Sequence, residues 1–183
     1  SRALIVLFLV GFLGNLGFGA FDSLESLFYR DVLHAGAEWM GFLSAIVGVG
    51  ATVGSLAAAR VPARRVTLSL LCALVAVEGL GAVLYVGTSS IACAAAGQLV
   101  LGVANGAIMP LRVTLTQRSC EIGHLGSVSA VMRVGISSSG TLPLLVAPFL
   151  ADALGVQPVL VGASLVVVAC GVALLVPARA ANG

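Results

Sequence analysis

Six runs of about 20 apolar residues fill the chain, and this pattern constrains its fold more than any motif does. A helix needs about that length of apolar sequence to cross the hydrocarbon layer of a bilayer. The 183 residues are 60% hydrophobic and 9% charged, a composition typical of membrane proteins. We therefore predict a single all-α, polytopic membrane domain. The expected transmembrane helices are 3–28, 39–59, 66–87, 91–111, 126–151 and 156–176.

The arginines predict the orientation of this domain in the membrane. The chain has nine arginines and no lysine. Eight of the arginines lie at or near the helix ends on one side of the predicted membrane, and only Arg30 lies on the other side. Because positive residues concentrate on the cytoplasmic side, we expect both termini in the cytoplasm. Arginine in place of lysine, with abundant alanine and valine, points to a GC-rich bacterial genome and to its inner membrane. The arginines at or near the cytoplasmic ends are Arg2, Arg60, Arg64, Arg65, Arg112, Arg118, Arg133 and Arg179.

Two further features follow from this orientation. Tyr29, Trp39 and Tyr85 fall at the outer ends of the runs and predict an aromatic belt at the membrane surface. The net charge of +2 is explained by topology, and no basic patch with interleaved aromatics predicts binding of nucleic acid.

The first run carries a polar face in otherwise apolar sequence. Lipid would penalise such a face, so we expect it to face the protein interior or a water-filled cavity. Asn15 and Gly19 are candidate contacts for a substrate in that cavity. Asp22 and Glu25 are candidate carboxylates for proton or cation coupling, and the alternative is that they only mark the end of the span. The residues of this face, spaced by four, four, three and three, are Gly11, Asn15, Gly19, Asp22 and Glu25.

The third and fourth runs place further polar groups at membrane depth. Glu78 lies roughly 18 Å from the cytoplasmic end of its run, near the middle of the bilayer. A charge there costs at least about 3 kcal/mol, so Glu78 needs a partner, water or a proton. It is the third candidate coupling carboxylate, with a structural interhelical bond as the alternative. Gln98 and Asn105 form a second polar stripe, for packing or for contact with a substrate. Pro110 and Arg112 are expected to end the fourth span.

Small residues recur at intervals of four in the second run and predict close packing of helix backbones. They are Ser44 and Gly48, and separately Gly50, Gly54 and Ala58.

Glycines, prolines and hydroxyls interrupt the fifth run and make it the least regular of the expected helices. Prolines at membrane depth free carbonyl groups that need partners, and hydroxyl groups can supply them. Ser138 and Thr141 are candidate substrate contacts on this helix. The sixth run is almost purely apolar and is expected to face lipid.

The residue types argue against an enzyme. The two histidines, His34 and His124, lie outside the expected spans, and the chain has no lysine, so neither residue type is available within a span as the partner of a catalytic serine. The four cysteines stand singly, without spacing typical of a metal or haem site, and no cofactor is expected. An intramembrane hydrolase that uses Ser137, Ser138 or Ser139 is a distant alternative.

The first three runs start on the cytoplasmic side and the last three start on the outer side. This arrangement predicts inverted repeats over residues 1–88 and 89–178. In addition, two stretches of the sequence resemble the second six-helix half of a major facilitator superfamily transporter, in the branch of proton-coupled drug, macrolide and siderophore exporters. They are NLGFGAFDSLESLFYRDVLHAGAEWMGFLSAIVGVGATVGSLAAAR and GVANGAIMPLRVTLTQR.

The resemblance implies that the six spans are helices seven to twelve of such a transporter. Helices seven, eight, ten and eleven would border the substrate cavity, and nine and twelve would face lipid. The loop from Gly54 to Arg65 resembles a degenerate GxLaDrxGRR loop, which makes Arg60, Arg64 and Arg65 candidates for a cytoplasmic gate. Ala58 stands where that pattern has aspartate, so a charge relay at this loop is in doubt.

We therefore expect the C-terminal half of a secondary transporter that exports lipophilic neutral or cationic small molecules in exchange for protons. Its partners would be the substrate, protons, the lipid bilayer and an N-terminal six-helix half. The alternative is a non-transporting structural or assembly subunit whose polar stripes serve helix packing.

Overall fold

The computed structural model describes residues 2–120 and 122–181, and all regular structure in these residues is helical. The helices are α1 (Arg2–Asp31), α2 (Ala37–Ala59), α3 (Leu68–Val86), α4 (Ile91–Ser119), α5 (Leu125–Ser139), α6 (Thr141–Leu154), α7 (Val156–Ala173) and α8 (Leu175–Ala181). Two short 3-10 turns, η1 (Ala63–Arg65) and η2 (Ile122–His124), lie in the connections.

Six segments of the described chain are long and apolar enough to cross a membrane, which confirms the predicted all-α fold with six helices of membrane-spanning length. They are Ala3–Asp31, Glu38–Ala59, Leu68–Val86, Ile91–Ser119, Leu125–Leu154 and Val156–Ala178.

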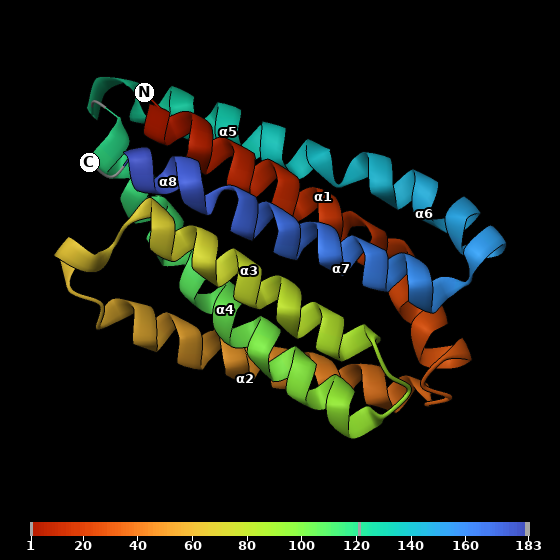
Figure 1. The fold of residues 1–183 in the computed structure, drawn as a ribbon. Helices are drawn as coiled ribbons and strands as arrows, with labels where there is room; N and C mark the ends of the chain where they lie inside the picture. Colours follow the sequence, from red (N-terminus) through yellow and green to blue (C-terminus); the bar gives the residue numbers. More distant parts are fainter. Residues whose placement is uncertain (1, 121, 182–183) are drawn as a thin grey trace.

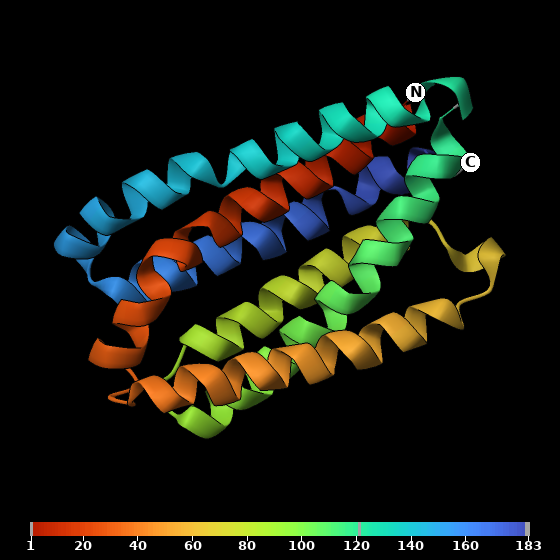
Figure 2. The ribbon, with the colours of Figure 1, turned by 180° about the vertical axis from the view of Figure 1, so that it is seen from behind.

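The helices form two layers (Figure 1). In one layer α1 packs on α5, α6 and α7, and in the other α4 packs on α2 and α3. Contacts between α3 and α7 join the layers. The two termini lie at the same end of the bundle as η1 and η2 (Figures 1 and 2). We call this end, which carries Arg60, Arg64, Arg65 and Arg118, the arginine-rich end.

Glycines bring α2 and α4 into backbone contact. A Cβ atom added at Gly54 would overlap the carbonyl oxygen of Val103, and one at Gly106 would overlap that of Ala51. A Cβ atom at Gly50 would lie 2.7 Å from the carbonyl oxygen of Leu99. The four-residue spacing of Gly50 and Gly54 therefore serves helix packing, as predicted.

The other small pair of α2 is uncovered. A Cβ atom at Gly48 would meet nothing within 4 Å, and Ser44 is exposed. The predicted packing role thus holds for one face of α2 and is wrong for Ser44 and Gly48 within the described bundle.

The fourth span does not end at Pro110 and Arg112, because α4 continues to Ser119. Proline lacks the N–H group that would bond to the carbonyl four residues earlier, here that of Gly106. The Ser55 hydroxyl of α2 donates to this carbonyl oxygen at 2.9 Å. The freed acceptor is satisfied across the helix contact, so the helix passes through the proline.

The fifth span is interrupted at Gly140, between α5 and α6. Pro143 cannot donate to the carbonyl of Ser139, which weakens the helix at this point. A Cβ atom at Gly19 would overlap the carbonyl oxygen of Gly140, so α1 crosses the break at backbone distance. The predicted irregularity of this helix is therefore a site of close packing.

The sixth span comprises α7 and α8 and is not only a lipid-facing helix. Buried residues of α7, among them Ser164, Val167 and Gly171, face the bundle. A Cβ atom at Gly171 would lie 2.6 Å from the backbone nitrogen of Ala76, so α7 packs closely on α3.

Substitutions at Gly54 and Gly48 test the contact between α2 and α4. We expect Gly54→Ala to lower the free energy of unfolding by about 2 kcal/mol, because its methyl group overlaps the α4 backbone. Gly48→Ala is the matched control and should be neutral, or stabilising by up to about 1 kcal/mol, since alanine favours the helix and the site is open. Unfolding in detergent followed by circular dichroism measures both, and equal effects of the two substitutions would contradict the contact.

Candidate functional site

A buried carboxylate lies in the middle of α3. Glu78 is ten residues, or roughly 15 Å, from the start of the helix, and only 6% of its surface is exposed. The side-chain amide of Asn105 donates to Glu78 Oε1 at 2.8 Å. Asn105 itself is exposed on α4. The bond therefore joins a buried acid to an uncovered face of the neighbouring helix.

Arg112 lies two helical turns beyond Asn105, toward the arginine-rich end. Sequence analysis placed it at the end of a span, but the structure places it inside α4, with its Nε atom buried. This Nε atom has no hydrogen-bond partner in the described structure. The charges of Arg112 and Glu78 lie close enough to interact. We call Glu78, Asn105 and Arg112 the midspan cluster.

The first helix lies beside this arginine. A Cβ atom at Gly11 would lie 3.6 Å from the guanidinium carbon of Arg112, an ordinary contact distance, and 2.5 Å from Cδ1 of Ile136 in α5. The polar face of α1 therefore begins at the midspan cluster.

Farther along the same face, the polar groups of α1 contact the fifth span. The Asn15 amide donates to the carbonyl oxygen of Ile136 at 2.8 Å and to Ser139 Oγ at 3.3 Å. Gly19 contacts Gly140, as described above. These residues hold α1 against α5 and α6, and their predicted role as substrate contacts stays a prediction.

A second polar cluster lies at the end of the bundle opposite the arginines. Tyr85 of α3 donates through its hydroxyl group to Glu25 Oε1 of α1 at 2.8 Å. Tyr29 and Gln98 lie beside this pair. Glu25 is half-buried, so it does more than mark the end of a span. We call Glu25, Tyr29, Tyr85 and Gln98 the tyrosine cluster.

The tyrosine cluster corrects the predicted aromatic belt. Tyr85 and Tyr29 are 1% and 3% exposed, so they lie in the core and not at a membrane surface. The ring of Tyr85 lies 6.2 Å from that of Phe21 and 5.3 Å from that of Phe28, between centroids. Only Trp39, at 37% exposure, suits the predicted belt.

The remaining candidate residues are not brought together. Asp22 is exposed, and its charge lies near that of Glu25 on the same helix. Thr141 is exposed, and the exposed Ser138 donates its hydroxyl to the Val134 carbonyl oxygen of its own helix at 2.7 Å. Over the described residues, no three histidine, cysteine, aspartate or glutamate side chains gather as metal ligands.

The candidate gate arginines surround η1. Arg60, Arg64 and Arg65 are exposed. Arg118 of α4 donates to the carbonyl oxygens of Ala63 and Val66, at 2.9 and 3.5 Å, and so ties this loop to the bundle.

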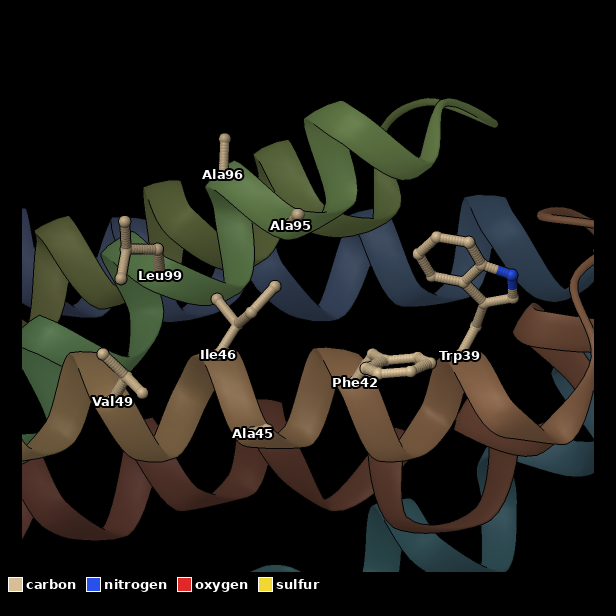
Figure 3. Close-up of a pocket in the computed structure, with 8 residues that line it drawn as sticks. All are labelled: Trp39, Phe42, Ala45, Ile46, Val49, Ala95, Ala96 and Leu99. Atoms are coloured by element: carbon tan, nitrogen blue, oxygen red, sulfur yellow. The ribbon is translucent and has the colours of Figure 1, made fainter.

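An apolar groove of about 710 Å³ lies between the halves of α2 and α4 that are far from the arginine-rich end (Figure 3). Trp39 stands at one end, and no charged side chain lines the groove. Such a surface suits a hydrocarbon chain and not a polar ligand. The lining residues are Trp39, Phe42, Ala45, Ile46, Val49, Ala95, Ala96 and Leu99.

Sequence reasoning missed three members of these clusters, Arg112, Tyr29 and Tyr85. The proline just before Arg112 suggested a helix end, and the position of Tyr85 near the end of its run suggested a surface. The spacing of seven residues from Asn105 to Arg112 was the available signal, because it places both on one face of an uninterrupted helix.

Comparison with known proteins finds no matching family model, no matching curated protein and no matching solved structure.

We expect Asn105→Ala to lower the free energy of unfolding by about 1 kcal/mol, because Glu78 loses its hydrogen-bond donor inside the bundle. Met109→Ala, at an exposed position on the same helix, is the control and should change it little. Chemical unfolding in detergent micelles measures both. In the background of Glu78→Leu, which removes the acceptor, the effect of Asn105→Ala should shrink, and an unchanged effect would show that the bond contributes nothing.

Proposed function

We propose that this chain is one six-helix bundle of a secondary active transporter. It corresponds to the C-terminal half of a proton-coupled exporter of the major facilitator superfamily, acting on lipophilic neutral or cationic small molecules. The observation that carries the proposal is the midspan cluster. There, a carboxylate buried at bilayer depth is bonded to an amide on an uncovered helix face, with an arginine two turns away.

The helix packing supports the proposed architecture. The two halves of the chain pack in the same pattern when α1 is matched with α4, α2 with α5–α6, and α3 with α7–α8. Under this matching, the contacts of α4 with α2 and α3 correspond to those of α1 with α5–α6 and α7. The contact of α3 with α7, which joins the layers, corresponds to itself under the same matching. Such an exchange symmetry is what inverted three-helix repeats produce, and transporters place their sites where such repeats meet.

Glu78 is the proposed proton-carrying group. A charged carboxylate at this depth is costly, and both partners that reduce the cost, Asn105 and Arg112, lie on α4. Gain or loss of the proton changes the attraction between α3 and α4. The same event therefore acts on an uncovered face of α4, which a substrate or a second bundle would contact.

The charges of the cluster support the substrate class. Arg112 is half-buried and its charge interacts with that of Glu78, so it is not presented as an isolated cation to an anionic substrate. The uncovered residues of α6 are mainly large and apolar, with Thr141 among them, and those of α5 are mostly small or hydroxyl-bearing, such as Ser138, with one arginine, Arg133. These surfaces suit a lipophilic compound with few polar groups. Asp22, which is exposed, is the second candidate for cation or proton contact.

The test is substrate-dependent proton movement in proteoliposomes that contain the complete protein. A panel of lipophilic cations serves as the substrate. We expect Glu78→Gln to reduce coupled proton movement at least tenfold at matched amounts of folded protein, because the amide cannot exchange a proton. Glu38→Gln, at an exposed position at the start of α2, is the isosteric control and should retain the wild-type rate.

Asp22→Asn separates the two candidate carboxylates. If only Asp22→Asn abolishes coupling, the face of α1 carries the proton and Glu78 has a structural role. If neither substitution alters proton movement, the proposed role of this chain in coupling is wrong.

A structural subunit without transport activity is the second candidate. Two contacts of α1 favour this candidate. The amide of Asn15 bonds to α5, and Gly19 packs against the backbone at Gly140, so both residues already serve helix packing. Absence of any substrate-dependent flux by the complete, folded protein would support this candidate.

A further inference from the structure

A pocket lined by two arginines lies at the arginine-rich end of the bundle, between the end of α2 and the start of α3. It has a volume of about 520 Å³. Its walls combine charged and apolar side chains. The residues that line it are Ala57, Arg60, Val61, Pro62, Arg65 and Leu70.

Its arginines are not used by the fold. Arg60 and Arg65 are exposed, and neither forms an ion pair with a described residue. The ion pair that the described chain does contain joins Arg30 to Asp31, which lie at the opposite end of the bundle. Two guanidinium groups without internal partners on one pocket form a site for an anion.

The backbone around this pocket is held in place. Arg118 bonds to the carbonyl oxygens of Ala63 and Val66 and so anchors the loop that carries Arg65. Arg60 caps the end of α2: its backbone N–H donates to the carbonyl oxygen of Ala57, and the N–H of Val61 donates to that of Ala58, each at 3.1 Å. The arginines are thus presented from anchored segments, which lowers the entropy lost on binding.

The pocket continues into an apolar surface. Val49, Val53 and Leu56 of α2 have large exposed fractions and lie toward one side of the helix, as does Arg60. From Arg60 to Val49 the helix rises roughly 16 Å, close to half the thickness of the hydrocarbon layer. An acyl chain of one leaflet has about this length. The surface therefore matches a molecule with an anionic head and an apolar tail.

We propose that this pocket binds the headgroup of an anionic phospholipid, with the phosphate between Arg60 and Arg65 and an acyl chain along α2. Basic pockets at helix ends are known to bind such headgroups. A soluble phosphate would use only the arginines and would gain nothing from Leu70, Val61 or the exposed face of α2. The site does not depend on transport activity.

The test is native mass spectrometry of the complete chain with dioleoyl-phosphatidylglycerol or dioleoyl-phosphatidylcholine, which share their acyl chains. Phosphatidylglycerol should bind more tightly to the wild type. In the double variant Arg60→Gln with Arg65→Gln, we expect this preference to fall about 25-fold, because each arginine contributes a factor of about five. The control Arg30→Gln with Arg133→Gln removes two exposed arginines elsewhere and should change the preference less than about twofold.

A second variant tests the pocket without changing the charge. Ala57→Trp places a large side chain on the wall of the pocket and should lower phosphatidylglycerol binding while circular dichroism shows an unchanged helix content. The proposal is overturned if the control lowers the preference as much as the pocket variant. It is also overturned if neither Ala57→Trp nor the arginine pair has an effect, or if inorganic phosphate alone binds as tightly as the lipid.

Discussion

Backbone contact between α4 and its two neighbours is the constraint on which the rest of the bundle depends. Gly102 and Gly106 face α2, and Gly97 faces α3, so α4 approaches both helices without intervening side chains. At these distances the register of the three helices is fixed to within a fraction of a turn. The amide of Asn105 can then reach Glu78, and Ser55 can supply the bond that Pro110 removes. The polar chemistry of the bundle is therefore a consequence of its smallest residues.

Composition and run length were enough to predict the six helical spans, because a bilayer leaves few other ways to satisfy a backbone. The depth of Glu78 and the need for a partner also followed from its position in an apolar run. The identity of that partner did not, since Gln98 and Asn105 lie on the same stripe and only the register of α3 against α4 selects Asn105. Local sequence cannot specify this register, because it depends on contacts with residues of another helix.

Helix ends and burial were the weakest predictions, and each failure has a physical cause. Pro110 was taken as a stop signal, but a hydroxyl on a different helix compensates for it. Tyr85 lies near the end of α3 and was expected at a surface, yet α1 extends past it and covers it with Phe21 and Phe28. In both cases a contact with a neighbouring helix, which the local sequence does not specify, changes the outcome expected from that sequence.

Trp39 is the only tryptophan in the chain, and it stands at the end of the apolar groove between α2 and α4 (Figure 3). Its indole ring is partly exposed, so its excited state responds to whether water or hydrocarbon lies beside it. The wavelength of its fluorescence emission should therefore shift when a hydrocarbon chain replaces water in this groove, without an added label. The molecule contains its own optical reporter, at the end of α2 opposite the one that carries the arginines.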